Sequence, residues 1–502
     1  MNLDSILDSE TRHSGGIHFT SREIIHQTID PLLANQNLDD AIFFDPACGS
    51  GNFLLEILRS YKISADQLIG IELNDFNACV ARVSIFLESK KFPKIIHGNS
   101  LRIDWKKIVR GKRIYIVGNP PFLGYSLQNF EQRSDVRRIF NGWGKFDYAA
   151  CWFKKAAEFM IGKNFETAFV ATSSICQGEH VSYLWQKLFD LGIKINFARK
   201  NFRWDLEANV YCAIIGFSFI DRAQKFIDGV EVQNINGYLL DAPNIFIEPR
   251  RDPICDVPRM LKGSQPTGDF FVEENFEPHE FVRPLIGAEE FLKNRSRFCL
   301  WLKDAPQEIL EIPSIKSKIE SIKNFRLSSP KKSTRDSAKT PWLFQEIRQP
   351  ATRYLAVPRV STSIREYLPI GFVDSKVIVT DALLIVPNAN LWLFGILSSK
   401  VHMVWLKIVC GRLGNGYRYS VSGVYNNFPF PKFDPRIEIN AQKILDARDS
   451  NRSLAELYDP NSMPIDLRRA HDENDKIVLD SYGFSESEIV SRLFEMYRDL
   501  TK

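Results

Sequence analysis

The sequence predicts an α/β fold whose first half is a doubly wound, mainly parallel sheet with helices on both faces. Short apolar runs typical of buried strands alternate with amphipathic helical segments from about residue 41 to residue 220. A small-residue turn follows the first strand, and a proline-rich turn follows a later one. Because such sheets bind ligands outside the carboxyl ends of their strands, both turns are expected to line one crevice.

The elements of this half follow from apolar periodicity, in chain order. The predicted strands are residues 41–44, 68–71, 95–98, 114–117, 167–172, 194–198 and 210–220. The predicted helices are residues 54–60, 75–88, 148–160 and 181–191.

The first strand runs into the turn Asp45-Pro46-Ala47-Cys48-Gly49-Ser50-Gly51-Asn52-Phe53, which leads into a helix. Gly49 and Gly51 can adopt positive φ and carry no side chain, so backbone N–H groups can approach a ligand closely. The turn lacks the third glycine of the dinucleotide fingerprint and the lysine of a P-loop. The next strand ends in Glu72, where a carboxylate can accept hydrogen bonds from both hydroxyls of a ribose. The alternative for Glu72 is a solvated strand end.

The strand at residues 114–117 is followed by Asn119-Pro120-Pro121-Phe122. Each proline ring fixes φ and removes a backbone donor, so the turn is stiff and holds an amide side chain beside unpaired carbonyls. Such a loop can accept hydrogen bonds from an exocyclic NH₂ while the aromatic ring stacks on the group that carries it. The alternative is a plain turn, because Asn-Pro and Pro-Pro pairs are common in turns.

In this order, the glycine turn, the acidic strand end and the Asn-Pro-Pro-Phe loop resemble the amino-methyltransferases that use S-adenosylmethionine. Among these, the chain is most similar to DNA adenine-N6 methyltransferases whose target-recognition region follows the catalytic domain. The other stretches that carry the resemblance are residues 16–20, 146–148, 171–179, 201–204, 358–361, 367–372, 411–413 and 417–420. The C-terminal stretches resemble the Type IIL restriction–modification enzymes, in which one polypeptide joins a nuclease, a methyltransferase and a recognition domain.

The resemblance implies a seven-stranded Rossmann-like methyltransferase sheet, with residues 210–220 as an antiparallel strand near one edge. It also implies that Asn119 and the Pro120 carbonyl accept hydrogen bonds from the target amine, in a catalytic loop that includes Pro121. Phe122 would stack on the flipped base, and Phe202, or else Trp204, would form the other aromatic wall. The residues expected to bind S-adenosylmethionine are Phe19, Thr20, Asp45, Pro46, Ala47, Gly49, Gly51, Glu72, Leu73, Asn99, Ser100 and Asn119.

One position departs from the family pattern. Asn99 follows the strand at residues 95–98, where the family usually has an aspartate against the adenine amine of the cofactor. An amide oxygen can still accept that bond, so we expect weaker cofactor selectivity and not loss of binding.

The chain is long enough, at 502 residues, for two or three domains. Residues 1–40 are expected to form a helical lid with the first cofactor motif, and residues 41–225 the methyltransferase domain. A connecting segment is expected at 226–280, a mixed α+β target-recognition domain at 281–432, and C-terminal helices at 433–502.

The partner implied by the resemblance is double-stranded DNA. The net charge of +4 is only mildly basic, but lysine and arginine far outnumber acidic residues between residues 313 and 365. That excess suits a polyanion, and the alternative is a solvated face. The residues expected to contact DNA are Arg359, Ser361, Thr362, Ser363, Arg365, Glu366, Arg412 and Arg418, of types that can reach base edges.

Several classes of protein do not fit the sequence. The cysteines and histidines show no metal-ligand or disulfide spacing, so we expect no metal site. No signal peptide or membrane-length apolar run is present, and a cytoplasmic, monomeric protein is expected. Because the first cofactor motif begins at Gly16, we also expect no nuclease domain ahead of it, and therefore methylation without cleavage unless a separate chain supplies the nuclease.

Two rival functions stay open from the sequence. The first is a methyltransferase that acts on an RNA adenine or a protein glutamine, and the second is a DNA-binding protein with a decayed methyltransferase site.

Overall fold

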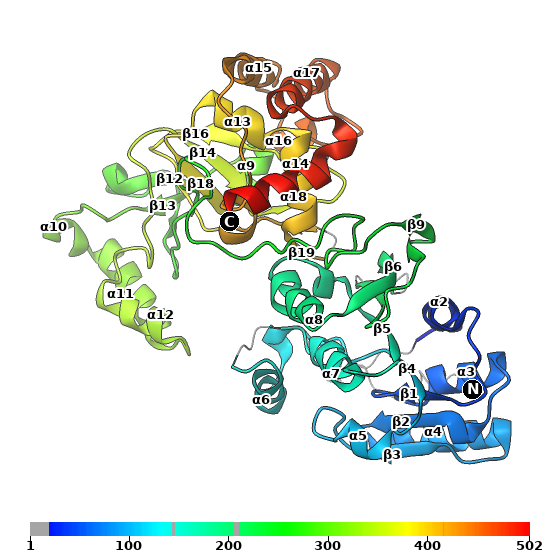
Figure 1. Ribbon diagram of the computed structural model, residues 1–502. Coiled ribbons are helices and arrows are strands. Elements are labelled where there is room, and N and C mark those ends of the chain that lie inside the picture. The colour runs from blue at the N-terminus through cyan, green and yellow to red at the C-terminus, as the bar shows by residue number, and fades with distance from the viewer. Residues whose placement is uncertain (1–19, 143–145, 205–209, 415) are drawn as a thin grey trace. The chain divides into compact units, whose positions relative to one another are not determined.

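A computed structural model describes residues 20–142, 146–204, 210–414 and 416–502 (Figure 1). The chain divides into two compact units, Met1–Ile247 and Glu248–Lys502. Each unit has its own sheets and helices.

The first unit is built on a nine-stranded sheet in the order β3-β2-β1-β4-β5-β7-β6-β8-β9. Strands β1 to β5 are parallel, β7 runs antiparallel between β5 and β6, and two short strands extend the edge beyond the seven expected. The strands are β1 (Ala41–Asp45), β2 (Leu68–Glu72), β3 (Lys94–His97), β4 (Arg113–Gly118), β5 (Glu166–Thr172), β6 (Lys194–Arg203), β7 (Tyr211–Ser218), β8 (Lys225–Ile227) and β9 (Val230–Val232).

Helices cover both faces of this sheet, as the apolar pattern predicts. The helices are α2 (Arg22–Leu33), α3 (Asn52–Ser60), α4 (Asp75–Ser89), α5 (Trp105–Ile108), α6 (Phe130–Ile139), α7 (Ala150–Met160) and α8 (Gln186–Asp190). Alternate residues of one strand point to opposite faces. Phe43 therefore joins the core formed with α2, α3 and α4, while Phe44 packs edge-to-face against Trp105 of α5.

The described residues of the N-terminal segment include Thr20, Ser21 and helix α2, and they make two kinds of contact. Residues 1–19, which include Gly16 and Phe19, lie outside the described residues. Helix α2 buries Ile25, Ile29 and Leu32 in the core of the first unit, so it covers the sheet. Thr20, two residues ahead of this helix, accepts a hydrogen bond from Asn119 of the Asn-Pro-Pro-Phe loop.

The second unit contains two four-stranded sheets and one three-stranded sheet, in the orders β10-β18-β14-β16, β11-β13-β12-β17 and β15-β20-β19. The strands are β10 (Leu261–Lys262), β11 (Phe271–Val272), β12 (Val282–Ile286), β13 (Arg297–Leu300), β14 (Tyr354–Pro358), β15 (Val360–Ser361), β16 (Gly371–Val373), β17 (Ile378–Val379), β18 (Leu383–Pro387), β19 (Gly411–Leu413) and β20 (Gly416–Arg418). The expected connecting segment, residues 226–280, thus supplies β9 to the first unit's sheet and β10 and β11 to these sheets.

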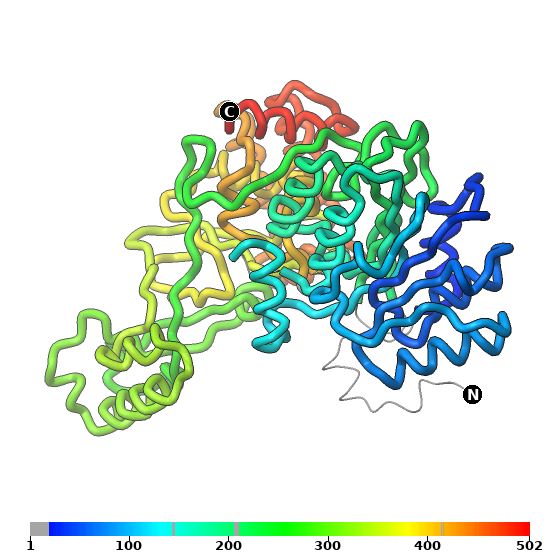
Figure 2. The backbone as a smooth tube through the Cα atoms, turned by 60° about the horizontal axis from the view of Figure 1, so that its bottom comes forward, coloured from blue at the N-terminus to red at the C-terminus, as the bar shows by residue number. Residues whose placement is uncertain are grey.

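Helices complete the second unit. They are α9 (Ala288–Lys293), α10 (Gln307–Leu310), α11 (Pro313–Leu327), α12 (Lys332–Asp336), α13 (Leu391–Leu397), α14 (Lys400–Val409), α15 (Pro435–Asp446), α16 (Leu454–Leu457), α17 (Ile465–Tyr482) and α18 (Ile489–Leu500). Helices α11 and α12, yellow-green in Figure 2, lie side by side in both views. The C-terminal stripe Ile489, Leu493, Phe494 and Tyr497 is buried, so it belongs to the core.

Within the described ranges, no single helix is long and apolar enough to cross a membrane. One bent pair, Leu391–Leu397 with Lys400–Val409, meets the criterion by length and composition.

Candidate functional site

The carboxyl ends of the parallel strands bring the predicted cofactor residues of the first unit together. Asp45 ends β1, Glu72 ends β2, and Asn119 directly follows β4. The Gly49 N–H donates to Glu72 Oε2 at 2.9 Å, which ties the glycine turn to the end of β2. The parallel pairing of β1 with β2 and β4 therefore brings Asp45, Glu72 and Asn119 to one edge of the sheet, although the sequence separates the first and last by about seventy residues.

The glycine turn is shaped for close backbone approach. Gly49 and Gly51 have φ values of 53° and 86°, which favour glycine. A Cβ at Gly51 would lie 3.0 Å from the Ala81 Cβ on α4, whereas a Cβ at Gly49 would meet nothing within 4 Å. Gly51 thus allows close helix packing, and Gly49 leaves open space over the turn. The buried Trp152 indole donates to the Pro46 carbonyl at 3.1 Å and so fixes the start of the turn.

Two carboxyl groups face this turn, Asp45 fully buried and Glu72 half-buried. Burial raises the pKa of Asp45 to about 8, and its Oδ1 accepts from the Ala47 N–H at 3.0 Å. Burial also raises the pKa of Glu72, although Glu72 accepts from the N–H groups of Gly49 and Asn74. A ligand that brings a cation and hydroxyl donors would compensate both carboxylates.

The loop after β3 holds Asn99 in a network that the sequence did not reveal. Asn99 Oδ1 accepts from the Leu101 N–H at 2.9 Å, and its Nδ2 donates to Asp135 Oδ2 at 3.4 Å. Asp135, on α6, is 4% exposed and also accepts from Arg102, Arg138 and Tyr148. The amide is thus oriented by a carboxylate 36 residues away, for which no local sequence signal exists.

The two other predicted residues near these strand ends differ in setting. Leu73 is 66% exposed and presents an apolar side chain beside Glu72. Ser100 is buried, and its hydroxyl accepts from the Trp105 indole at 3.2 Å. The Ser100 side chain thus supports the loop, while Leu73 is free to contact a ligand.

In the Asn-Pro-Pro-Phe loop, the side-chain nitrogen of Asn119 has a hydrogen-bond partner, and the side-chain oxygen has none among the described residues. Asn119 Nδ2 donates to Thr20 Oγ1 at 3.1 Å, which fixes the orientation of the amide. Asn119 Oδ1 is buried and has no hydrogen-bond partner among the described residues. Gly118, just before it, leaves room for Asp45, because a Cβ there would lie 2.5 Å from Asp45 Oδ1. A buried acceptor without a donor costs about 1–3 kcal/mol, so this oxygen is suited to a ligand donor.

Three aromatic residues predicted around the target base pack against one core cluster. Phe122 is 9% exposed, and its ring meets the ring of Trp204 edge-to-face, with 5.4 Å between centroids and 85° between planes. Phe202 lies on the same cluster, with the Arg199 guanidinium 5.2 Å from its ring centroid. Of the two candidates for the second wall, Trp204 is therefore the one in ring contact with Phe122.

In the second unit, a small sheet gathers predicted DNA-contacting residues from two distant stretches. Strand β15 pairs with β20, and β20 pairs with β19, so Ser361 lies opposite Tyr417, and Tyr417 lies opposite Arg412. Arg418 is exposed on β20, and the Arg412 guanidinium lies 4.5 Å from the Tyr417 ring centroid. Thr362, Ser363 and Arg365 lie in the turn that follows β15.

Other basic and acidic residues of the predicted interface are held within the fold. Arg359 donates to the Asp381 carbonyl at 2.8 Å, and Glu366 accepts from Arg468 at 2.7 Å. Arg326, inside the basic run, is completely buried and donates only to backbone carbonyls. Its acceptors are Pro266, Thr267, Ser337, Thr340 and Leu343. Lys331, Lys332 and Lys339 are exposed.

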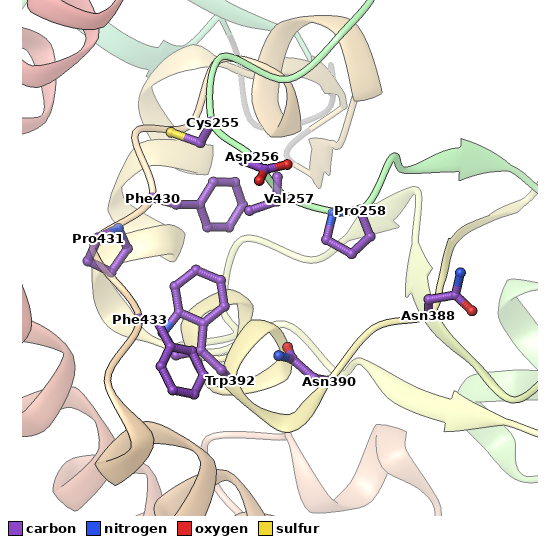
Figure 3. Close-up of a pocket in the computed structure, with 10 residues that line it drawn as sticks. All are labelled: Cys255, Asp256, Val257, Pro258, Asn388, Asn390, Trp392, Phe430, Pro431 and Phe433. Atoms are coloured by element: carbon purple, nitrogen blue, oxygen red, sulfur yellow. The ribbon is translucent and has the colours of Figure 1, made fainter.

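A pocket of about 320 Å³ lies elsewhere in the second unit (Figure 3). Trp392, Phe430 and Phe433 form its aromatic wall, and Asp256 and Asn390 line it as well. None of the residues predicted to contact DNA lines it. The described part of the chain shows no group of three or more His, Cys, Asp or Glu side chains arranged to hold a metal ion.

Known families match almost the whole chain. The DNA-methyltransferase-domain model of MmeI matches residues 25–93 and 89–228, the MmeI target-recognition-domain model matches residues 241–432, and the MmeI C-terminal-domain model matches residues 431–502.

Individual relatives agree with these domain matches. DNA methyltransferase A of Bacillus subtilis is 34% identical over 100% of this chain and 68% of its own length. The methylase subunit of the type I restriction enzyme MjaVII of Methanocaldococcus jannaschii is 35% identical over 24% of this chain and 22% of its own. The solved structure of the Type IIL restriction–modification enzyme MmeI in complex with DNA has a TM-score of 0.89 at 36% identity, and covers 99% of this chain and 81% of that chain. The chain therefore belongs to the MmeI family of restriction–modification DNA methyltransferases.

Proposed function

We propose that this chain transfers a methyl group from S-adenosylmethionine to the N6 amine of an adenine that is flipped out of duplex DNA. The observation that carries the proposal is the buried Oδ1 of Asn119, which has no partner in the part of the chain that the structure describes and whose amide is oriented by Thr20. An oxygen in this setting lacks a donor, and an exocyclic amine supplies one. The Asn-Pro-Pro-Phe sequence, which resembles the loop of adenine-N6 methyltransferases, favours adenine over cytosine.

The residues at the strand ends fit the cofactor. Glu72 would accept from the ribose hydroxyls, Asp45 would compensate the positive charge of the methionine end, and the open side of Gly49 would receive the backbone of the ligand. Leu73 would pack on the adenine ring. When bound, S-adenosylmethionine supplies a sulfonium methyl group with a neutral leaving group.

The chain mainly has to align the target amine. Asn119 Oδ1 and the Pro120 carbonyl would accept its two N–H bonds, which directs the nitrogen lone pair toward the methyl group. Positioning of this kind contributes about 7–11 kcal/mol. The proton becomes acidic only after transfer, so the loop needs no general base. Phe122 and one further aromatic ring would stack on the base, which offsets part of the few kcal/mol that flipping costs.

The second unit would hold the duplex. Arg412 and Arg418, with the turn at residues 361–365, would reach base edges, Arg412 from the face of the β15-β20-β19 sheet that carries Tyr417 and Arg418 from the other face. Lys331, Lys332 and Lys339 would contact phosphates. Arg359 and Glu366 would position neighbouring residues, since each already has an internal partner.

The identity of the product tests the proposal. DNA from cells that express the chain would be hydrolysed to nucleosides and analysed by mass spectrometry, and N6-methyladenine is expected. Detection of N4-methylcytosine in its place would make cytosine the target. Labelling of RNA or protein but not of DNA would refute the proposal. Single-molecule sequencing of the same DNA would give the target sequence and show whether one strand or both are modified.

We also propose that this chain acts as a monomer, that residues 25–502 methylate DNA without cutting it, and that a nuclease outside these residues supplies any cleavage. The support is that the matching family models describe a methyltransferase, a recognition domain and a C-terminal domain. Double-strand breaks produced by the purified chain with Mg²⁺ and S-adenosylmethionine would contradict the proposal.

A further inference from the structure

The segment directly after the catalytic loop exposes two large apolar side chains. Leu127, in a 3-10 turn at Tyr125–Leu127, is 72% exposed, and Phe130, the first residue of α6, is 85% exposed. Phe130 has the largest exposed fraction of any large apolar side chain in the described chain. Exposed apolar side chains mark contact surfaces when they gather on one part of the surface, as these two do on one short segment.

The turn that carries them is fixed to the catalytic loop. Gln128 is 3% exposed, and its Nε2 donates to the Leu123 carbonyl at 3.0 Å and to the Phe146 carbonyl at 2.7 Å. Leu123 directly follows Phe122, and its carbonyl also accepts from the Tyr148 N–H at 2.9 Å. Leu127 therefore directly precedes Gln128, whose side chain is hydrogen-bonded to Leu123, the residue that follows Phe122.

The segment is rigid and carries cationic groups. Asn129 and Gln132 form a reciprocal cap at the start of α6, which fixes Phe130 at the helix N-terminus. The Arg133 guanidinium lies 5.0 Å from the Tyr125 ring centroid and donates to the carbonyls of Tyr125 and Ser126. Arg137 is exposed on the same helix. A fixed apolar tip flanked by cations matches the chemistry of side chains that enter DNA between stacked bases.

We propose that Leu127 and Phe130 form a wedge that enters the duplex at the flipped base and occupies the space that the base leaves. This inference rests on the proposed function, because only a flipping enzyme opens such a gap. The aromatic ring of Phe130 would stack on a neighbouring base pair, and Leu127 would block the return of the target base. The wedge thereby supports Asn119 by lengthening the time that the target amine spends in the site.

The test compares duplexes with and without the need for a wedge. Single-turnover methylation would be measured on a duplex that carries the target site and on the same duplex with an abasic position opposite the target base, where flipping is already favoured. Leu127→Ala and Phe130→Ala are expected to slow methylation of the paired duplex by about tenfold, in keeping with the worth of one stacked base. Both should slow methylation of the abasic duplex by less than twofold.

Matched controls lie on α4 and just after it in the same unit. Leu87 and Phe92 are each 62% exposed, so Leu87→Ala and Phe92→Ala should leave both rates unchanged. A 2-aminopurine at the target position should lose its flipping signal in the two wedge variants and keep it in the controls.

Three outcomes would overturn the wedge. They are equal slowing on both duplexes, no slowing on either, and a change of oligomeric state in the variants, which would assign this surface to a second copy of the chain. If the wild-type chain transfers no methyl group to the paired duplex, the proposed function fails together with the wedge, whereas normal transfer with one of these three outcomes removes the wedge alone.

Discussion

The residues predicted for function meet different settings in the two units of the chain. In the first unit, Asn119 Oδ1 is buried and has no partner within the described ranges, and burial raises the pKa of Asp45 to about 8. In the second unit, several charged residues that looked available for DNA are satisfied inside the fold, such as Arg326 and Arg359. At the predicted cofactor site, Asn119 thus keeps unmet bonding capacity for a ligand, whereas Arg326 and Arg359 stabilise loops of their own unit.

This difference shows how to separate functional from structural charge. A buried group that lacks a partner destabilises the folded chain, so its retention points to a ligand. A buried group with a full set of partners points to folding. Exposed lysines lie between these cases, and only a binding measurement can assign them.

The largest effect is expected at Asn119. Asn119→Ala removes the acceptor that orients the target amine and should lower the single-turnover methylation rate by at least about a hundredfold, as loss of one preorganised hydrogen-bonding group does elsewhere. Binding of S-adenosylmethionine, measured by calorimetry, should change little. A variant that still methylates at near the wild-type rate would remove the central assignment and with it the contrast between the units.

Arg326 tests whether a buried, fully hydrogen-bonded charge of the second unit stabilises the fold. Arg326→Met leaves several buried carbonyls without a donor and should lower the free energy of unfolding of the second unit by about 3 kcal/mol or more. Urea denaturation measures the change. The matched variant Lys331→Met alters an exposed residue of the same basic run and should leave stability unchanged. Equal stability of the two variants would contradict a structural role for Arg326.

The raised pKa of Asp45 predicts a pH-dependent cofactor affinity. At pH values below its pKa of about 8, the buried Asp45 carboxyl is largely protonated, whereas a cationic ligand needs the ionised form. The affinity for S-adenosylmethionine should therefore increase by up to about tenfold per pH unit between pH 6 and pH 8, and then level off. Titrations in that range measure it, and Asp45→Asn should bind weakly at every pH. A flat profile in the wild-type chain would mean that Asp45 does not meet the cation.

The two candidates for the second aromatic wall should differ. Trp204→Ala removes the ring that packs edge-to-face against Phe122 and should let the Phe122 ring tilt, which weakens its stacking on the flipped base and lowers the rate by about tenfold. Phe202→Ala should have a smaller effect, since its ring lies under Arg199. Methylation rates with 2-aminopurine fluorescence would rank them, and the reverse order would restore Phe202 as the wall.

The smallest effect is expected from exposed lysines. Lys331→Gln with Lys332→Gln should weaken DNA binding several-fold and reduce the salt slope by about two, near one for each phosphate contact. Lys316→Gln with Lys318→Gln is the control, because these lysines pair with Glu311 and Asp269. Fluorescence anisotropy at several salt concentrations distinguishes them. Equal slopes would place the phosphate contacts elsewhere.

Much of the first unit could be predicted from the sequence because its signals are local. Strand β1 and the turn at Asp45 to Phe53 are contiguous, and so are β4 and the loop at Asn119 to Phe122, so apolar periodicity and turn chemistry identify both. The added strands β8 and β9 were missed, because three-residue strands give too short a pattern to recognise. The Asn99–Asp135 pair was missed because its members lie 36 residues apart.

Local sequence patterns account for the α/β fold of the first unit, the order of its motifs and the chemistry that each motif can perform. The availability of the predicted residues depends instead on the folded chain. Folding left Asn119 Oδ1 without a partner among the described residues, set Trp204 against Phe122, buried Arg326 among carbonyls and exposed Phe130 on the segment that follows the Asn-Pro-Pro-Phe loop. The physical reason is range: turn and strand preferences act over a few neighbouring residues, whereas burial and hydrogen-bond partners depend on segments that meet only after folding.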